Sequence, residues 1–328
     1  MKDAMAGFEL YQPTDLDTAL ESAARFGKAG WLLAGGYDSL DWFKDRVKVP
    51  EAVIDLSSIG ELHGIREVDG GVEIGAMTTL TEVSRSPLVR GRFQLLADAA
   101  SEVASPQIRN AGTLGGNLCQ DTRCWYYRYG VDCYRAGGNT CYAAAPDAQN
   151  REHAIFGASR CVAVSPSDTA PALVALEASM VVRSLGGERV VPAEDFFMEP
   201  GVDIERMTVL EPDEVLTAIR VPPTWADATL SFEKVCDRNS WDFALASVAA
   251  AFRTDGITID DARIVCGAVQ CVPRRMREVE RWLSGRARTP EGVDAAGAMA
   301  VKGAEPLAYN GYKIPLVTNL VKRAIRSI

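Results

Sequence analysis

Apolar positions in the first hundred residues follow two periods, which predicts helices interleaved with strands. From Leu16 to Ala24 they recur at helical spacing, after an N-cap residue at Thr14 and before a terminating glycine at Gly27. The uninterrupted apolar run at residues 31–34 is instead typical of a buried strand. Helices are therefore expected over residues 14–27, 37–45, 78–84 and 93–104, and strands over residues 31–34, 53–56 and 72–76.

The rest of the chain predicts a second, smaller domain. Periodicity is lost between residues 119 and 160, and a loop of that length inside a domain is usually functional. Further helices are expected over residues 170–177, 276–283, 290–302 and 317–328, and further strands over residues 180–183, 215–221, 231–234, 243–253 and 262–269. The proline pair at 222–223 marks a boundary. We therefore expect an α+β chain with one domain over residues 1–223, an insertion at 119–161, and a second domain over residues 226–328.

Length and charge narrow the class of protein. The chain has 328 residues, 47% of them hydrophobic, which is enough for two cores. Its formal net charge of −9 disfavours nucleic acid and anionic membranes as partners. No apolar run approaches the roughly 18 residues that span a bilayer, and residues 1–8 contain no apolar signal core. The expected location is the cytoplasm, with periplasmic export as part of a complex left open.

Two glycine-rich segments are candidates for holding a phosphate. The first contains Gly35 and Gly36 and joins a predicted strand to a predicted helix. The second contains Gly115 and Gly116, with threonine and asparagine beside them. Adjacent glycines let backbone N–H groups turn toward an anion, although each segment alone is also explained by a tight turn. Two such segments in one domain favour a dinucleotide whose pyrophosphate lies between them.

Crowded cysteines are the most unusual feature of the composition. Five of the eight fall between residues 119 and 161, and in a reducing compartment such crowding indicates metal or redox chemistry. Cys124, Cys133, Cys141 and Cys161 are separated by 8, 7 and 19 residues. Zinc sites usually contain closely spaced pairs, whereas an iron–sulfur cubane accepts four thiolates from a wrapped loop. The tyrosines among them would shield a cluster from water: Tyr126, Tyr127, Tyr129, Tyr134 and Tyr142.

A free thiol is also often a small buried hydrophobe. We favour that interpretation for Cys236, Cys266 and Cys271. Cys119 ranks below the other four cysteines of the segment as a ligand. The two histidines, His63 and His153, are not assigned to a metal.

Three motifs together resemble one family. They are the second glycine segment at residues 112–118, the Asp-Thr-Arg-Cys run at residues 121–124 and the Ser-Asp-Thr-Ala-Pro-Ala-Leu run at residues 167–173. This combination is similar to the FAD-binding medium subunits of the molybdenum hydroxylases, the xanthine dehydrogenase family, over essentially the whole chain. The family implies a two-subdomain FAD-binding domain of the vanillyl-alcohol-oxidase (PCMH) type, followed by a flavoprotein C-terminal domain.

The cysteine-bearing insertion is similar to that of the β subunit of 4-hydroxybenzoyl-CoA reductase, where it carries a [4Fe-4S] cluster. Residues 137–141 look more like that reductase. Residues 150–157 look more like the flavoprotein of periplasmic aldehyde oxidoreductases. We expect the reductase type to be the nearer of the two.

Carried over position by position, the resemblance implies a site for each cofactor. Asp168 would bind the sugar-alcohol chain of FAD, and Leu216 and Lys234 would pack on or bond to the isoalloxazine. Alone, Asp168 and Lys234 are explained as a helix N-cap and a surface charge. The family usually has Thr or Asn where this chain has Tyr37. The FAD pyrophosphate would be held by Leu32, Leu33, Ala34, Gly35, Gly36, Tyr37, Asp38, Ser39, Thr113, Leu114, Gly115, Gly116 and Asn117, and the cluster by Cys124, Cys133, Cys141 and Cys161.

The resemblance implies an electron-transfer subunit without substrate chemistry of its own. A large subunit with a molybdenum cofactor would transform the substrate, and a small subunit with two [2Fe-2S] clusters would exchange electrons with FAD. The additional cubane would exchange electrons with ferredoxin or another external partner. The complex is expected to be a dimer of heterotrimers. One alternative is the flavoprotein of an aldehyde, xanthine or N-heterocycle oxidoreductase. An alternative of another class is a self-contained flavin oxidase or a zinc-stabilised binding module.

Overall fold

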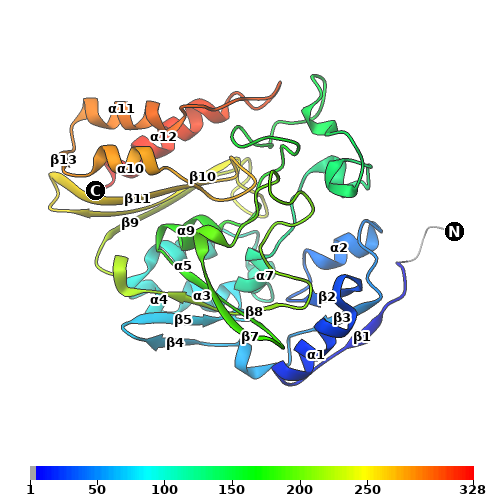
Figure 1. The fold of residues 1–328 in the computed structure, drawn as a ribbon. Helices are drawn as coiled ribbons and strands as arrows, with labels where there is room; N and C mark the ends of the chain where they lie inside the picture. Colours follow the sequence, from blue (N-terminus) through cyan, green and yellow to red (C-terminus); the bar gives the residue numbers. More distant parts are fainter. Residues whose placement is uncertain (1–4) are drawn as a thin grey trace.

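The computed structural model describes residues 5–328, which form three β-sheets with helices packed around them (Figure 1). The N-terminal sheet is parallel, with strand order β1-β3-β2. Its strands are β1 (Glu9–Tyr11), β2 (Gly30–Leu33) and β3 (Ala52–Asp55), and its helices are α1 (Leu16–Phe26) and α2 (Ser39–Lys44). Helix α1 begins after Asp15, whose carboxylate accepts the Thr18 N–H at 2.9 Å, so the expected N-cap at Thr14 is wrong by one residue.

The second sheet is antiparallel and has the order β4-β5-β8-β6-β7. Its strands are β4 (Ile65–Val68), β5 (Gly71–Gly75), β6 (Ser179–Ser184), β7 (Gly187–Pro192) and β8 (Val215–Val221). Strand β8 has the range that its apolar run predicts, because it lies between two neighbours in the middle of the sheet. The edge strands β4 and β7 were not predicted, since both are largely exposed and lack an apolar pattern.

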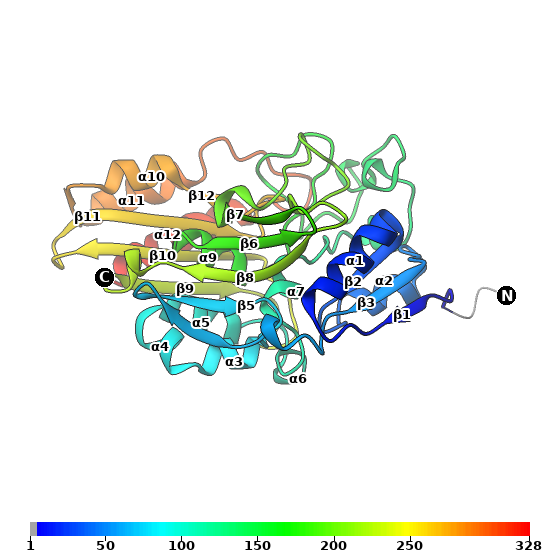
Figure 2. The same ribbon diagram turned by 60° about the horizontal axis from the view of Figure 1, so that its bottom comes forward.

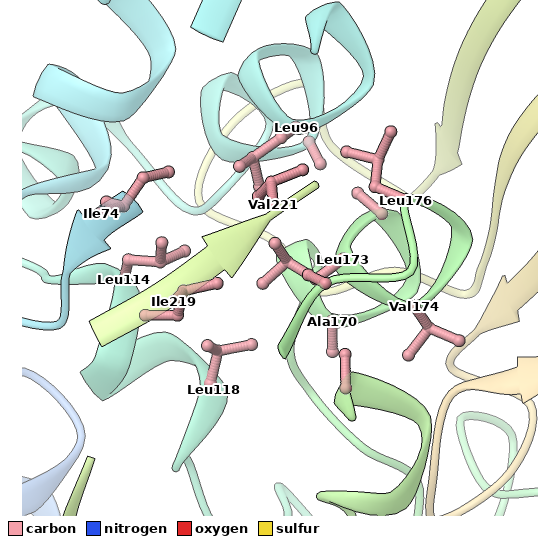
Figure 3. Close-up of a cluster of buried hydrophobic side chains, with 14 of the residues drawn as sticks. Ile74, Leu96, Leu114, Leu118, Ala170, Leu173, Val174, Leu176, Ile219 and Val221 are labelled. Carbon is pink, nitrogen blue, oxygen red and sulfur yellow. The ribbon is translucent and has the colours of Figure 1, made fainter. Parts of the chain in front are cut away.

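A helical layer separates this sheet from the third one. It contains α3 (Leu80–Arg85), α4 (Pro87–Arg92), α5 (Gln94–Ser101), α6 (Pro106–Arg109), α7 (Leu114–Leu118) and α9 (Thr169–Ala175). Every residue of α9 is buried, and Leu173 lies in one apolar cluster with Leu96 of α5 and Ile219 of β8 (Figure 3). The same cluster includes Ala249 and Val265 of the third sheet. The first two-thirds of the chain and the C-terminal part therefore share a core.

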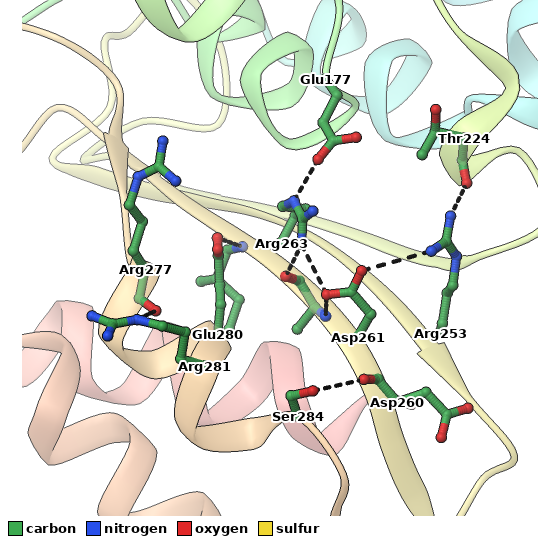
Figure 4. Close-up of polar contacts among 12 residues, drawn as sticks. Glu177, Thr224, Arg253, Asp260, Asp261, Arg263, Arg277, Glu280, Arg281 and Ser284 are labelled. Carbon is green, nitrogen blue, oxygen red and sulfur yellow. Dashed lines mark hydrogen bonds and ion pairs between the residues drawn. The ribbon is translucent and has the colours of Figure 1, made fainter.

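The third sheet has the order β12-β11-β10-β9, with β13 added on β11. Helices α10, α11 and α12 cover its outer face (Figure 2). On its inner side, Arg263 of β11 pairs with Glu177 at 2.7 Å, and Arg253 of β10 donates to the Thr224 carbonyl (Figure 4). The elements are β9 (Thr229–Val235), β10 (Ala246–Thr254), β11 (Thr258–Gly267), β12 (Arg274–Arg275), β13 (Arg286–Ala287), α10 (Arg277–Leu283), α11 (Pro290–Ala300) and α12 (Lys313–Arg326).

The cysteine-rich segment at residues 119–161 is irregular, as expected. All of it is described, and it contains α8 (Trp125–Arg128), two short 3-10 turns at Tyr134–Ala136 and Tyr142–Ala144, and no strand. It lies beside the N-terminal sheet and the C-terminal sheet (Figure 1). The observed mixture of helices and antiparallel and parallel sheets confirms the expected α+β class. Within residues 5–328, no helix combines the length and apolar character that crossing a membrane requires.

Candidate functional site

A cleft of about 800 Å³ runs between the N-terminal sheet, the second sheet and the C-terminal part; we call it the central cleft. Most of the residues predicted to hold a dinucleotide line it. They are Leu32, Ala34, Tyr37, Asp38, Ser39, Thr113, Gly115, Gly116, Asn117, Asp168 and Leu216. The others lie behind its wall: Leu33, Gly35, Gly36, Leu114 and Lys234.

The two glycine segments pack directly against each other. Gly35 has φ +77°, and a Cβ there would lie 2.5 Å from the carbonyl oxygen of Ala111. A Cβ on Gly116 would lie 2.8 Å from the carbonyl oxygen of Ala34. Only glycine permits this approach of the two backbones. Ala34 of the first segment and Gly115 and Gly116 of the second line the central cleft.

The second glycine segment differs from the expected ring of free N–H donors. The Leu114 N–H donates to the Thr78 carbonyl, and the Gly115 N–H donates to the Ala76 carbonyl. The Gly116 N–H is capped by the Thr113 hydroxyl at 3.0 Å. These backbone donors therefore serve the fold. Positive charge at the cleft comes from a side chain instead.

That side chain is Arg123, which lines the central cleft. Its Nη1 donates to Asp38 Oδ1 at 3.0 Å, and the guanidinium lies 4.8 Å from the centre of the Phe243 ring. Asp38 also pairs with the more buried Arg128 and accepts from Trp42 Nε1. Asp38 is thus shared between two arginines, which leaves the Arg123 guanidinium as the cationic group at this part of the wall.

Asp168 and Lys234 form a buried ion pair at the other end of the cleft. Lys234 Nζ donates to Asp168 Oδ2 at 2.7 Å and to the carbonyl oxygens of Glu102 at 2.8 Å and Asp242 at 2.9 Å. The side chains are 1% and 5% exposed. Burial raises the pKa of Asp168 to about 6, and the Lys234 ammonium opposes that rise. Asp168 faces the cleft, whereas Lys234 acts on it from behind.

Several cleft residues were missed by the sequence prediction. Gln120 lines the cleft with a buried Oε1 that has no partner in the described part of the chain, so it offers an acceptor to a bound N–H or O–H group. Trp241 and Phe243 reach the cleft from the loop after β9. Trp241 is 68% exposed and has φ +55°, an uncommon backbone for a bulky residue. No short motif marks these residues, because the fold alone brings them to the site.

The four predicted cysteine ligands line a second, smaller space of about 20 Å³, which we call the cysteine cavity. Cys124, Cys133, Cys141 and Cys161 come from four separate turns of the segment and face this one space. Burial raises the pKa of Cys124 to about 12 and also raises that of Cys141. A metal would therefore displace thiol protons on binding.

Among the described residues, these thiols do not form a site for a single metal ion. Tetrahedral zinc needs sulfurs roughly 4 Å apart. Within residues 5–328 there is no group of three or more His, Cys, Asp or Glu side chains close enough to hold a metal ion. The donor set suits a larger four-thiolate centre, although the cavity would have to widen to admit one.

The remaining candidates fall outside the cysteine cavity. Cys119 lines the central cleft, in agreement with its lower rank as a ligand. His153 lies behind Cys124, with Nε2 3.2 Å from the thiol sulfur and a buried Nδ1 for which residues 5–328 supply no partner. Burial lowers the pKa of His153 to about 4, so it is neutral. Cys266 and Cys271 are buried in the core, as expected of structural thiols.

Comparisons with known proteins agree with this geometry. Residues 6–224 match the family model of the FAD binding domain in molybdopterin dehydrogenase, and residues 231–328 match that of the CO dehydrogenase flavoprotein C-terminal domain. The chain is 33% identical to the carbon monoxide dehydrogenase medium chain of Hydrogenophaga pseudoflava, over 98% of this chain and 96% of that protein. It is 34% identical to the aldehyde oxidoreductase FAD-binding subunit PaoB of Escherichia coli, over 90% and 89%.

A solved structure supports the same assignment. The Hydrogenophaga pseudoflava carbon monoxide dehydrogenase that lacks the Mo-pyranopterin moiety of its cofactor contains a chain with a TM-score of 0.78 to this one, at 32% identity. The match covers 98% of this chain and 97% of the other. The close approach of the two glycine segments, the Arg123 guanidinium and the Gln120 acceptor of the central cleft fit FAD. The chain thus belongs to the family of FAD-binding medium subunits of the molybdopterin dehydrogenases, which are oxidoreductase subunits.

Proposed function

We propose that this chain is the electron-transfer subunit of a molybdenum-containing oxidoreductase complex, with FAD in the central cleft and a [4Fe-4S] cluster in the cysteine cavity. The observation that carries the proposal is the convergence of four cysteines on one cavity next to a cleft of dinucleotide size. The proposed domains are residues 1–223 and 226–328. Family models that match residues 6–224 and 231–328 support this division.

In the proposed FAD site, each part of the cleft has a separate task. Thr113 and Asn117 flank the pyrophosphate, and Arg123 supplies its positive charge. Asp168 accepts hydrogen bonds from the sugar-alcohol chain, with Lys234 keeping the carboxylate ionised and in place. Leu216 packs against the isoalloxazine. Lys234 is therefore a positioning residue in this proposal and does not touch the flavin.

Bound flavin exchanges one or two electrons, so it connects one-electron centres to a two-electron partner. The protein's part is to exclude water and fix the position of the flavin. Phe243 and Trp241 close one side of the cleft, and the apolar wall at Leu216 closes another. The four cysteine thiols would lose their protons and hold the cluster. Binding a cluster would require the cavity, about 20 Å³ here, to widen.

The proposed partners are a large subunit with a molybdenum cofactor and a small subunit with two [2Fe-2S] clusters. The names of the relatives support a multi-subunit assembly, since they describe a medium chain and an FAD-binding subunit. A ferredoxin or another external carrier would exchange electrons with the cubane. Eight cysteines without a disulfide suit the cytoplasm. We propose a dimer of heterotrimers, without nucleic acid or membrane partners.

Two substrate classes are open for the complex. A reductase of the 4-hydroxybenzoyl-CoA type is favoured by the sequence at residues 137–141 and by the four-cysteine segment. An aldehyde oxidoreductase is favoured by the sequence at residues 150–157 and by the 34% identity to PaoB. The substrate pocket would lie in the large subunit in either case.

The first test measures cofactor content in the full chain purified without oxygen. The proposal predicts bound FAD. It also predicts about four iron atoms and about four acid-labile sulfides per chain. Cys133→Ser and Cys141→Ser should lower the iron content and leave FAD bound. Cys119→Ser is the matched control, because this thiol belongs to the same segment but lines the central cleft. Stoichiometric zinc without iron, or equal iron in all three variants, would contradict the cluster.

The second test separates an electron relay from a self-contained oxidase. The isolated chain should be reduced by dithionite and reoxidised by an artificial acceptor, yet should not turn over aldehydes, N-heterocycles or aromatic thioesters. Turnover of any of these by the chain alone would refute the relay function while leaving the cofactor content unaffected.

A further inference from the structure

One charged side chain, Arg135, lies on the wall of the cysteine cavity together with all four cysteines. It follows Cys133 in the 3-10 turn at Tyr134–Ala136, and its side chain is 1% exposed. Few arginines are buried to this extent without a strong partner, because removing the guanidinium from water is costly.

The contacts of Arg135 leave part of its guanidinium unsatisfied. Nη1 donates to the Glu205 carbonyl at 3.2 Å and lies 3.5 Å from Asp121 Oδ1, and Nη2 lies 3.6 Å from the Cys271 sulfur. Its Nε is buried and has no partner among the described residues. A buried N–H without an acceptor costs about 1–3 kcal/mol, and more on a charged group. The four cysteine thiols line the same cavity wall as this guanidinium, so sulfur atoms are candidate acceptors for the unpaired N–H.

The charge of Arg135 is only partly neutralised by the protein. Asp121 is its nearest carboxylate, at the long distance of 3.5 Å. The same carboxylate also lies 3.7 Å from Lys48 Nζ and accepts the Thr122 N–H at 2.7 Å. One carboxylate thus serves two cations. These three side chains carry a net positive charge, and Arg135 places it on the cavity wall with the four cysteine sulfurs.

We propose that Arg135 sets the reduction potential of the cluster in the cysteine cavity, by placing a cation and an N–H donor against its sulfurs. This inference rests on the proposed function. A cluster with four thiolate ligands is negatively charged and gains a further negative charge on reduction. A buried cation and a hydrogen bond to sulfur therefore stabilise the reduced form more than the oxidised form and raise the potential. A cluster tuned in this direction accepts electrons from the flavin more readily.

The test is a redox titration of the full chain, followed through the EPR signal of the reduced cluster, in wild type and matched variants. Arg135→Gln removes the charge, and the midpoint should become more negative. Asp121→Asn removes the shared counter-charge with little change of shape, and the midpoint should become more positive. Arg128→Gln is the control: Arg128 is a largely buried arginine of the same segment, paired with Asp38, that does not line the cavity. Its shift should be smaller than that of Arg135→Gln.

The outcomes separate this inference from the proposal beneath it. Wild-type protein without iron and sulfide would refute the cluster and the inference together. Iron-loaded variants whose midpoints equal the wild-type value would refute the inference alone, as would an Arg128→Gln shift as large as that of Arg135→Gln. If Arg135→Gln does not load iron, the Asp121→Asn variant tests the inference instead. Only a midpoint potential more positive than that of wild type agrees with the role of Arg135.

Discussion

Replacing Lys234 with methionine should be among the most damaging single changes outside the apolar core. Methionine keeps most of the aliphatic stem but removes the ammonium. The carboxylate of Asp168, 5% exposed, would lose the cation that it pairs with among residues 5–328, and the carbonyls of Glu102 and Asp242 would lose the Lys234 donor. Because neither member of the pair is screened by water, the discount for surface ion pairs does not apply. Breaking such a pair from one side costs about 3–5 kcal/mol.

The loss of stability caused by Lys234→Met should become smaller as the pH falls. Burial already raises the pKa of Asp168 to about 6, and without Lys234 opposing burial it rises further. The folded variant then holds a proton at pH values where the unfolded chain, with a carboxyl pKa near 3.9, has released it. When the folded state binds more protons than the unfolded state, the free energy of unfolding increases as the pH falls. Part of the deficit at pH 7.5 should therefore be recovered at pH 5.5.

The assay is equilibrium urea denaturation of FAD-free protein, so that cofactor loss does not add to the difference. Lys302→Met is the control, because Lys302 forms an exposed pair with Glu278 at 4.0 Å and its loss should cost less than about 1 kcal/mol. Two results would refute the reasoning: a Lys234→Met variant as stable as the control at pH 7.5, or a deficit that grows on acidification.

Two further changes test the glycine contact and a buried lysine. Gly35→Ala should cost at least about 1–2 kcal/mol from its left-handed backbone, plus the clash with the Ala111 carbonyl, and should weaken FAD binding in a fluorescence titration. Gly60→Ala, which meets nothing within 4 Å, should change neither property. Burial lowers the pKa of Lys313 to about 7, so between pH 7 and 10 the unfolded chain binds a proton that the folded chain lacks. The stability of wild type relative to Lys313→Met should rise with pH over that window, by up to about 1.4 kcal/mol per pH unit in urea denaturation.

The elements that the sequence predicts well are those whose pattern is local. Strand β8 is apolar because it is central, and Gly35-Gly36 marks a turn with positive φ at both residues. The long irregular stretch after Leu118 was also readable, since its residues lack any period. Edge strands such as β7 could not be predicted, because their exposed residues show no alternation of apolar and polar positions.

What the sequence could not predict depends on contacts between distant segments. Lys234 pairs with Asp168, a residue 66 positions away, and does not itself line the central cleft. The N–H groups of the second glycine segment were expected to be free, yet the turn at residues 76–78 accepts two of them. The charged wall at Arg123 follows from its pairing with Asp38, 85 positions away. No local pattern encodes such partners.

The position of the cysteine segment gives the two proposed cofactors a short connection. Asp121 and Arg123 line the central cleft, whereas Cys124 lines the cysteine cavity. Successive Cα atoms are about 3.8 Å apart, so Asp121 and Cys124 are separated by at most about 11 Å along the backbone. The segment begins at the end of α7, which carries the second glycine pair, so the peptide that shapes one site continues directly into the other. A cluster ligated at Cys124 would therefore stay next to a flavin in the central cleft however the outer turns of the segment move. Asp121 lines the cleft and also lies 3.5 Å from Arg135, so it connects the electrostatics of the two sites. A change of charge on one cofactor should therefore change the electrostatic potential at the other.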